Sequence, residues 1–202
     1  MFCYNIFGDI MIIRGIKDVI RVICTPFVFL RFKSIWNLKK YLKDRNKQSG
    51  LYASVYNQYF LKRGSYIGIN AEFKTTPYFP HGVLGIFISD MSVIGKNAVI
   101  FQQVTIGADR MVDSKNPGNP TIGDNAYIGA GAKIIGNIKI GNNCRIGTNA
   151  VVHQDLKDNS VAVVSQTRII EKDKKLDNRF LNLNNDGVLE VYEDGVFKEY
   201  KK

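Results

Sequence analysis

The segment Thr121–Val152 reads TIGDNAYIGAGAKIIGNIKIGNNCRIGTNAVV and repeats with a period of six residues. Because side chains two apart on a strand share one face, two positions of each hexapeptide point inward. Glycine, asparagine and aspartate between them supply the turns. The inward residues are Ile122, Ile128, Ile134, Ile140, Ile146 and Val152, joined by Ala126, Ala132, Ile138, Cys144 and Ala150. This pattern predicts a mainly β protein, a parallel β-helix of short strands and tight turns.

The same period appears earlier, in residues 94–107 (IGKNAVIFQQVTIG), and more weakly from residue 67. We therefore expect the β-helix to occupy residues 65–170. Two irregular segments interrupt it, residues 76–85 (TPYFPHGVLG) and 108–120 (ADRMVDSKNPGNP). Binding groups concentrate where a strict repeat is interrupted, so these two segments are the first places to look for a site.

Residues 1–64 form a basic segment in which we expect helices. Asp9 is placed to begin a first helix that Pro26 ends, Ser34 to begin a second, and residues 51–62 form a third. A solenoid leaves unpaired strand edges at its first coil, so these helices are expected to cap that end of the β-helix.

Residues 171–202 follow the repeat as a polar tail. Within it, the alternating residues 188–200 contain the turn Asp194-Gly195 and predict a β-hairpin. We expect the hairpin to serve packing or contact between subunits.

The positive charge of the chain is concentrated in its N-terminal segment. The net charge is +10, and residues 1–65 contain twelve Lys and Arg against three Asp and Glu. This excess predicts either peripheral contact with an anionic membrane surface or a solvated helical face. The basic residues form no DNA- or RNA-reading motif, so no nucleic-acid partner is expected.

The compartment predicted from the sequence is the cytoplasm, with the inner face of the membrane as a peripheral location. Residues 22–30 are the longest uncharged stretch near the N-terminus, too short to span a bilayer, and they contain Pro26. Cys3, Cys24 and Cys144 are odd in number and unrelated in spacing, which is typical of reduced thiols.

Histidine is the side chain best suited to accept a proton near neutral pH, and the chain has two. His153 follows the inward Val152, so the repeat places it outward on a late coil, as an ordinary exposed residue. His81 lies in the first interruption, between Pro80 and Gly82. Of the two, His81 is the candidate general base, although a solitary histidine is often structural.

Four motifs follow one another in order around and after His81. They are FPHGVLGIFIS (residues 79–89), IGKN (94–97), FQQVTIG (101–107) and PTIGDNAYIGAGAKIIG (120–136). Together they resemble the serine acetyltransferase-like branch of the hexapeptide acyltransferases, over about half of the chain. The resemblance implies a left-handed β-helix, assembled as a homotrimer with sites between subunits, that transfers acetyl from acetyl-CoA to a hydroxyl. His81 matches the catalytic histidine of that family.

The resemblance also implies the residues that hold acetyl-CoA. Gly107, Ala130 and Thr148 would line the slot for the pantetheine arm, where small residues permit close approach. The candidate partners of the cofactor's phosphates are Lys133, Arg145 and Arg168. No metal is expected, because a zinc-dependent hydratase on the same fold uses three histidines and this chain has two.

Three departures from serine acetyltransferases concern the acceptor. Where those enzymes have an aspartate before the catalytic histidine, an aspartate about fifteen residues earlier and a histidine before the later proline, this chain has Pro80, Tyr66 and Asn119. They favour a different hydroxyl, most readily that of a sugar or surface polysaccharide. The alternatives are a serine O-acetyltransferase and a non-catalytic β-helix scaffold.

Two sets of residues complete the predicted site. Asp109, Arg110 and Asn119, in or next to the second interruption, are candidates for binding the acceptor. Glu72 and Asp90 are the carboxylates nearest to His81 in the sequence, and both are candidates for orienting its ring.

Overall fold

The computed structural model describes residues 23–165, 173, 177–184 and 186–201. The chain divides into two compact units, Met1–Val164 and Ser165–Lys202. The larger unit contains the β-helix and the helices before it, and the smaller contains the C-terminal strands. No helix among the described residues is long and apolar enough to cross a membrane.

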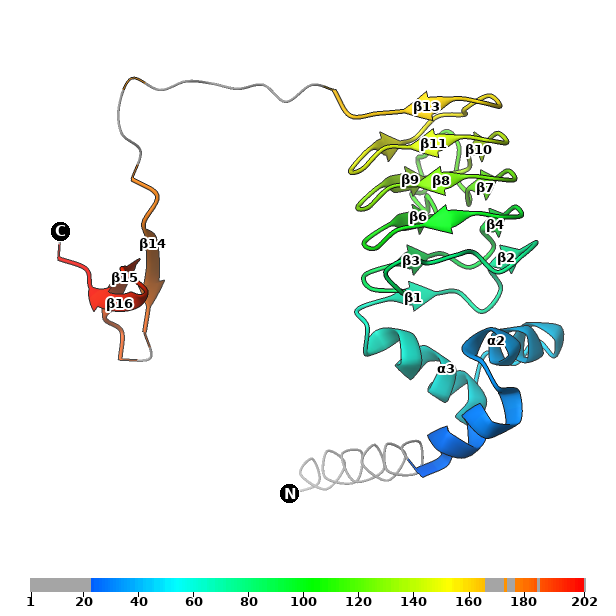
Figure 1. Cartoon of the computed structure of the whole chain (residues 1–202), viewed down its shortest axis with the longest axis horizontal. Coiled ribbons are helices and arrows are strands. Elements are labelled where there is room, and N and C mark those ends of the chain that lie inside the picture. Colours follow the sequence, from blue (N-terminus) through cyan, green and yellow to red (C-terminus); the bar gives the residue numbers. More distant parts are fainter. Residues whose placement is uncertain (1–22, 166–172, 174–176, 185, 202) are drawn as a thin grey trace. The chain divides into compact units, whose positions relative to one another are not determined.

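The larger unit is a triangular prism of stacked coils whose sides are three parallel sheets (Figure 1). The first sheet contains β1 (Tyr66–Ile67), β3 (Phe87–Ile88), β6 (Thr105–Gly107), β9 (Lys133–Ile135) and β12 (Val151–Val152). The second contains β2 (Glu72–Phe73), β4 (Val93–Ile94), β7 (Thr121–Ile122) and β10 (Lys139–Ile140). The third contains β5 (Val99–Ile100), β8 (Tyr127–Ile128), β11 (Arg145–Ile146) and β13 (Val161–Ala162). Each coil therefore contributes about one strand to each sheet.

The predicted inward residues form the core of the prism. Ile100, Ile128 and Ile146 pair in register across the third sheet, and all three are fully buried. Ile106 and Ile134 are paired and buried in the same way in the first sheet. Stacking identical branched side chains removes a continuous apolar column from water, at roughly 25 cal/mol per Å² of buried apolar area.

Three corners join the sheets, and we name each by its main feature. The histidine corner joins the third sheet to the first and contains residues 79–86, 101–104, 129–132 and 147–150. The loop corner joins the first sheet to the second and contains residues 68–71, 89–92, 108–120, 136–138 and 153–155. The ladder corner joins the second sheet to the third and contains residues 74–77, 95–98, 123–126, 141–144 and 157–160.

At the ladder corner, asparagine side chains bond to one another from coil to coil. The amide of Asn97 donates to Asn125 at 3.0 Å, Asn125 to Asn143 at 3.0 Å, and Asn143 to Asn159 at 3.1 Å. All four have a positive φ, a left-handed conformation that asparagine tolerates better than most residues. The turn chemistry read from the sequence therefore also holds the coils in register.

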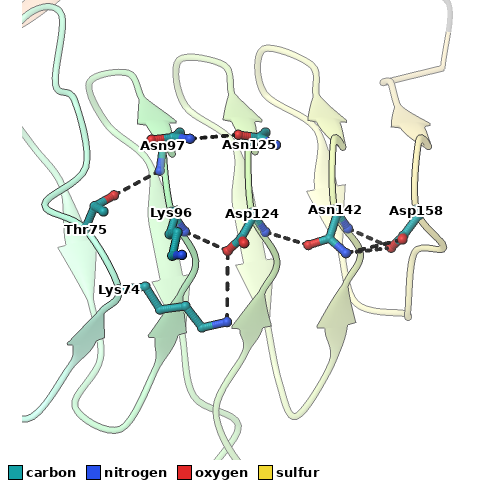
Figure 2. Close-up of polar contacts among 8 residues, drawn as sticks. All are labelled: Lys74, Thr75, Lys96, Asn97, Asp124, Asn125, Asn142 and Asp158. Atoms are coloured by element: carbon teal, nitrogen blue, oxygen red, sulfur yellow. Dashed lines mark hydrogen bonds and ion pairs between the residues drawn. The ribbon is translucent and has the colours of Figure 1, made fainter.

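A second row of contacts runs beside the first (Figure 2). Carboxylate or amide oxygens of Asp124, Asn142 and Asp158 each accept from the backbone N–H of the preceding coil, at 2.7–2.8 Å. The Lys74 ammonium lies 4.0 Å from Asp124. These bonds satisfy backbone donors at the turns that no strand partner reaches.

Two helices, α2 (Ile35–Asp44) and α3 (Leu51–Leu61), lie against the first coil (Figure 1). Ser34 begins α2 as predicted, since its hydroxyl accepts from the Asn37 N–H at 3.1 Å. Buried Leu38, Leu42 and Phe60 join the helices to the core of the β-helix. The predicted helical cap is therefore present.

The cap also supplies hydrogen-bond donors to the first coil, which has no coil before it. The buried Lys39 ammonium donates to the carbonyls of Ile69, at 3.1 Å, and Ala71, and the Tyr56 hydroxyl donates to that of Ile67 at 2.9 Å. Without them these carbonyls would be buried unpaired, which costs about 1–3 kcal/mol each.

The prediction that Pro26 ends the first helix is wrong, because residues 23–32 are helical. The proposed beginning at Asp9 lies outside the described residues. Val28 is buried, and Phe29 and Phe32 pack against the core. Packing of this apolar face outweighs the hydrogen bond that proline cannot donate.

In the smaller unit, β14 (Phe180–Leu183), β15 (Leu189–Glu193) and β16 (Val196–Glu199) form an antiparallel sheet. The predicted hairpin is β15 and β16, with Asp194 and Gly195 at positive φ in the turn. The third strand, β14, was not predicted, because the residues around it were taken as part of the polar tail.

Candidate active site

His81 lies at the histidine corner, on the first interruption of the repeat. Before it, Tyr78 forms a parallel bridge with Val99 of the third sheet, and after it the chain enters β3 in the first sheet. Phe79 stacks on Trp36 of α2, with ring centroids 5.6 Å apart. Gly82 has a φ of +68°, which favours glycine in the turn directly after His81. The helical cap and the turn together hold the histidine at the outside of the corner.

The ring of His81 is held from the next coil. Its Nδ1 lies 2.7 Å from Oε1 of Gln102, and Phe101 contacts it edge to face, with centroids 5.5 Å apart. Because an amide oxygen only accepts hydrogen bonds, this contact needs a proton on Nδ1, and a neutral ring that makes it has its lone pair on Nε2. His81 is exposed, so this lone pair is accessible to an acceptor hydroxyl.

The two carboxylates considered as orienting partners have other contacts. Asp90 accepts from the Tyr66 hydroxyl at 2.7 Å and from the Asn70 N–H at 2.9 Å. Burial, and then the bond to Asp90, raise the pKa of Tyr66 to about 12. Glu72 lies 3.7 Å from the Lys43 ammonium. Within one copy of the chain the contacts recorded for Glu72 and Asp90 are therefore with other residues, and the side chain that contacts the Nδ1 of His81 is Gln102.

A row of backbone donors runs along the histidine corner beside His81. Among the described residues, the N–H groups of Gln102, Ala130 and Thr148 bond to no backbone carbonyl. They occupy equivalent positions on three successive coils, since the Gly131 N–H donates to Gln102 and the Asn149 N–H to Ala130. An extended ligand with spaced carbonyl groups fits such a row.

Small residues at this corner let successive coils approach each other closely. A side chain at Gly129 would come within 2.8 Å of the Thr148 nitrogen, so the coils are in close backbone contact there. Lys133 begins β9 directly after this corner, and its ammonium donates to two carbonyls of the corner, those of Gln103 and Gly131, both at 2.9 Å. The corner thus combines open donors with a positive charge.

The other residues predicted to hold acetyl-CoA are not at this corner. Gly107 ends β6 at the opposite edge of the first sheet, next to the long loop. Arg145 is exposed on the third sheet, in a groove that it lines with Tyr127 and Asn143. Arg168 lies outside the described residues. One copy of the chain therefore brings together only Ala130, Lys133 and Thr148 of the predicted set.

The predicted acceptor-binding residues lie at the loop corner. Asp109 pairs with Gly118 through two backbone hydrogen bonds of 2.8 and 3.0 Å, which close the loop. Its carboxylate accepts from the Ser114 hydroxyl and the Met111 N–H, and these bonds lower its pKa. Asp109 therefore shapes the loop itself, whereas the neighbouring Arg110 is exposed.

Asn119, at the end of the same loop, accepts from the Ser89 hydroxyl at 3.2 Å. The strands of the first sheet begin at the histidine corner and end at the loop corner, so the two corners lie at opposite ends of these strands. Within one subunit, Asp109, Arg110 and Asn119 are therefore not brought to His81. His153, the other histidine, is exposed at the loop corner.

Two comparisons of sequence agree on the family. Residues 119–154 match the family described as bacterial transferase hexapeptide (six repeats). The serine acetyltransferase of Bacillus pumilus is 37% identical over 105 residues, which cover 52% of this chain and 47% of the relative. That of Staphylococcus aureus strain Mu50 is 35% identical over 152 residues, covering 73% and 66%. The chain spans about half the length of the first of these curated relatives.

Solved structures agree as well. Serine acetyltransferase isoform 3 of Entamoeba histolytica, in complex with cysteine, superposes with a TM-score of 0.59 at 27% identity, covering 69% of this chain and 50% of that one. A serine acetyltransferase in complex with CoA gives 0.56 at 30% identity, covering 67% and 54%. The β-helix is left-handed, as predicted. The chain belongs to the hexapeptide-repeat acyltransferases, in their serine acetyltransferase-like branch.

Proposed function

We propose that the protein is an acetyl-CoA-dependent O-acetyltransferase with His81 as its general base. The observation that carries this proposal is the exposed His81 ring, whose Nδ1 lies 2.7 Å from the amide oxygen of Gln102, so that the neutral ring making this contact has its lone pair on Nε2. In the reaction, Nε2 takes the proton of the acceptor hydroxyl as its oxygen attacks the thioester carbonyl carbon. The carbon–sulfur bond then breaks, and the proton passes to the departing sulfur. General base catalysis of this kind contributes about 10²–10⁴-fold in rate.

The row of free donors supports acetyl-CoA as the acetyl source. The pantetheine arm is an extended chain with two amide groups, and the N–H groups of Ala130 and Thr148 are spaced by one coil along the corner. Gln102 offers the donor nearest to His81, and its N–H is suited to the oxyanion that develops on the thioester. The Lys133 ammonium is placed to bind a negatively charged phosphate of the cofactor. The relative solved in complex with CoA is consistent with this choice.

The comparisons favour L-serine as the acceptor, because the matched relatives are named serine acetyltransferases. A saccharide hydroxyl is the second candidate, and specific residues favour it. Pro80 precedes His81, Tyr66 replaces an expected acid, and Asn119 is bonded to Ser89. The groups that hold the amino and carboxyl ends of serine in that family are therefore changed in this chain.

We further propose that the active unit is a homotrimer. His81 and the long loop at residues 108–120 lie at opposite ends of the strands of the first sheet. One copy alone therefore does not bring the general base and the cofactor slot together with the loop proposed to bind the acceptor. A neighbouring copy that places its loop corner beside the histidine corner would complete the site. Gly107, beside that loop, would then join Ala130 and Thr148. Light scattering on the purified chain should give the mass of three copies.

The test is a CoA-release assay with L-serine, simple sugars and surface polysaccharide as acceptors. Native protein should release CoA in the presence of one acceptor class, with the acetyl ester found on it by mass spectrometry. His81→Ala should lower kcat by about 10²-fold or more, and Gln48→Ala, a change at an exposed residue between α2 and α3, should leave it unchanged. Equal turnover by native protein and a folded His81→Ala variant would refute His81 as the base.

A further inference from the structure

We propose that Gln102 is a positioning residue that selects the tautomer of His81. The inference deepens the proposed function and rests on it for its kinetic consequences. The central observation is the 2.7 Å contact between Nδ1 of His81 and Oε1 of Gln102. Among the contacts of the described residues, the ring of His81 meets only Gln102 and Phe101, and no carboxylate.

Backbone hydrogen bonds hold the segments that carry His81 and Gln102 next to each other. The Gly131 N–H donates to the Gln102 carbonyl at 3.0 Å, which ties this residue to the following coil. The neighbouring Gln103 N–H donates to Leu84 at 2.9 Å, three residues after His81. The histidine loop and the glutamine are therefore parts of one hydrogen-bonded corner, and the side-chain contact does not depend on a mobile segment.

The edge of Phe101 restricts the ring further. Its centroid lies 5.5 Å from that of His81 at an interplanar angle of 83°, and Tyr127 packs on its other side at 5.2 Å. The phenylalanine limits rotation of the imidazole, while the amide oxygen decides which nitrogen is protonated.

An amide and a carboxylate both select a tautomer of the histidine ring, but they differ in how they stabilise its charged form. Both accept from Nδ1–H and so select the same neutral tautomer. A carboxylate additionally stabilises the imidazolium ion through its charge, whereas the amide of Gln102 is neutral. We therefore expect less charge stabilisation of the imidazolium formed during transfer than a carboxylate would give.

The first test measures the tautomer without any substrate. In ¹⁵N-histidine-labelled protein, long-range ¹H–¹⁵N spectra report the protonation of each ring nitrogen, and His153→Gln removes the second histidine from the spectrum. Native protein should show Nδ1–H and an unprotonated Nε2. Gln102→Leu should shift the ring toward the Nε2–H tautomer that prevails for free histidine in water. An unchanged tautomer in a folded Gln102→Leu protein would overturn the proposal.

The second test is kinetic and uses the acceptor identified by CoA release. Gln102→Leu should lower kcat about tenfold or more while leaving KM for acetyl-CoA within about twofold. Gln102→Glu should restore the tautomer and most of kcat, and should move the acid limb of the pH–rate profile upward by about one pH unit. Gln48→Leu, the same change at an exposed glutamine between α2 and α3, should match native protein.

The two tests separate this inference from the proposed function. A tautomer shift in Gln102→Leu with no acetyl transfer to any acceptor would support the positioning role and refute the function. Normal catalysis with native kcat in Gln102→Leu would refute the positioning role and leave the function in place. A Gln102→Glu protein that keeps the low kcat of Gln102→Leu would also count against Gln102 as the residue that selects the tautomer.

Discussion

The asparagine ladder makes a stability prediction that separates hydrogen bonding from backbone conformation. Asn125 sits in the middle of the ladder, accepts from Asn97 and donates to Asn143, both at 3.0 Å, and has a φ of +59°. Replacing it with alanine removes both side-chain bonds and places a β-carbon in the left-handed region. Replacing it with glycine removes the same bonds and leaves the conformation unstrained.

The magnitudes follow from these two contributions. The two bonds are exposed, so their loss should cost about 0.5 kcal/mol each. Alanine in the left-handed region adds about 1–2 kcal/mol, whereas glycine adds about 0.5–1 kcal/mol through the greater freedom of the unfolded chain. We expect Asn125→Ala to lower the free energy of unfolding by about 2–3 kcal/mol and Asn125→Gly by about 1.5–2 kcal/mol.

Urea unfolding followed by circular dichroism, at one fixed chain concentration, measures both variants. Acetyl transfer at low temperature should stay at the native rate, because Asn125 lies on the ladder corner and His81 on the histidine corner. Asn125→Gly that is as unstable as Asn125→Ala would show that the left-handed backbone carries no cost. Native stability in both variants would show that the side-chain bonds of the ladder contribute nothing to the free energy of unfolding.

Three further changes test other parts of the chain. Ala130→Trp should raise KM for acetyl-CoA about tenfold without lowering kcat, and steady-state kinetics that show an unchanged KM would remove Ala130 from the cofactor slot. Gly131→Ala should destabilise by about 1–2 kcal/mol in urea, because its φ is +71° and the new carbon would overlap the Asn149 side chain; native stability would contradict this. Burial, and then the charge of Lys43, lower the pKa of Lys39 to about 8. Since the unfolded chain holds that proton to higher pH, the free energy of unfolding should rise between about pH 8 and pH 10 by at most about 1.4 kcal/mol per pH unit, and Lys39→Met should lose this slope in the same urea measurements.

The sequence was sufficient to predict the core and the turns of the β-helix. Burial repeats every six residues, and a β-helix has few other ways to place a side chain such as Ile128 or Ile146, both fully buried. Turn residues were predictable for the same reason, and Asn125 and Asn143 adopt the left-handed conformation that their residue type favours. Local rules succeed here because each hexapeptide repeats the same arrangement of one buried strand residue and one turn.

The partner of His81 could not be predicted in this way. Regular coils place Asn125 beside Asn143, eighteen residues later, but His81 meets Gln102 at a separation of twenty-one. The difference arises because the first interruption lengthens its coil, and the six-residue period does not say how the extra residues fold. Sequence proximity instead pointed to Asp90, which the coil places at the loop corner.

The end of the first helix could not be predicted for a similar reason. A local rule predicts that Pro26 ends the helix, yet burial of Val28 in the core continues it. This tertiary contact is not contained in the local pattern. The binding of an acceptor by Asp109 stays a prediction, and the structure adds that its carboxylate accepts from Ser114 within the same loop.

The division of the site between two corners suggests how cofactor and acceptor specificity are separated. A parallel β-helix repeats its turn geometry every coil, at a spacing of about 4.8 Å, so free donors such as those of Ala130 and Thr148 follow from the fold itself. That row suits an extended chain of amides whatever the acceptor is. The acceptor loop, in contrast, is closed by contacts of its own, through Asp109 and Asn119, and lies at the opposite edge. Changes in the loop, such as that at Asn119, can therefore alter the proposed acceptor site without disturbing the row of donors or the His81–Gln102 pair within the same copy.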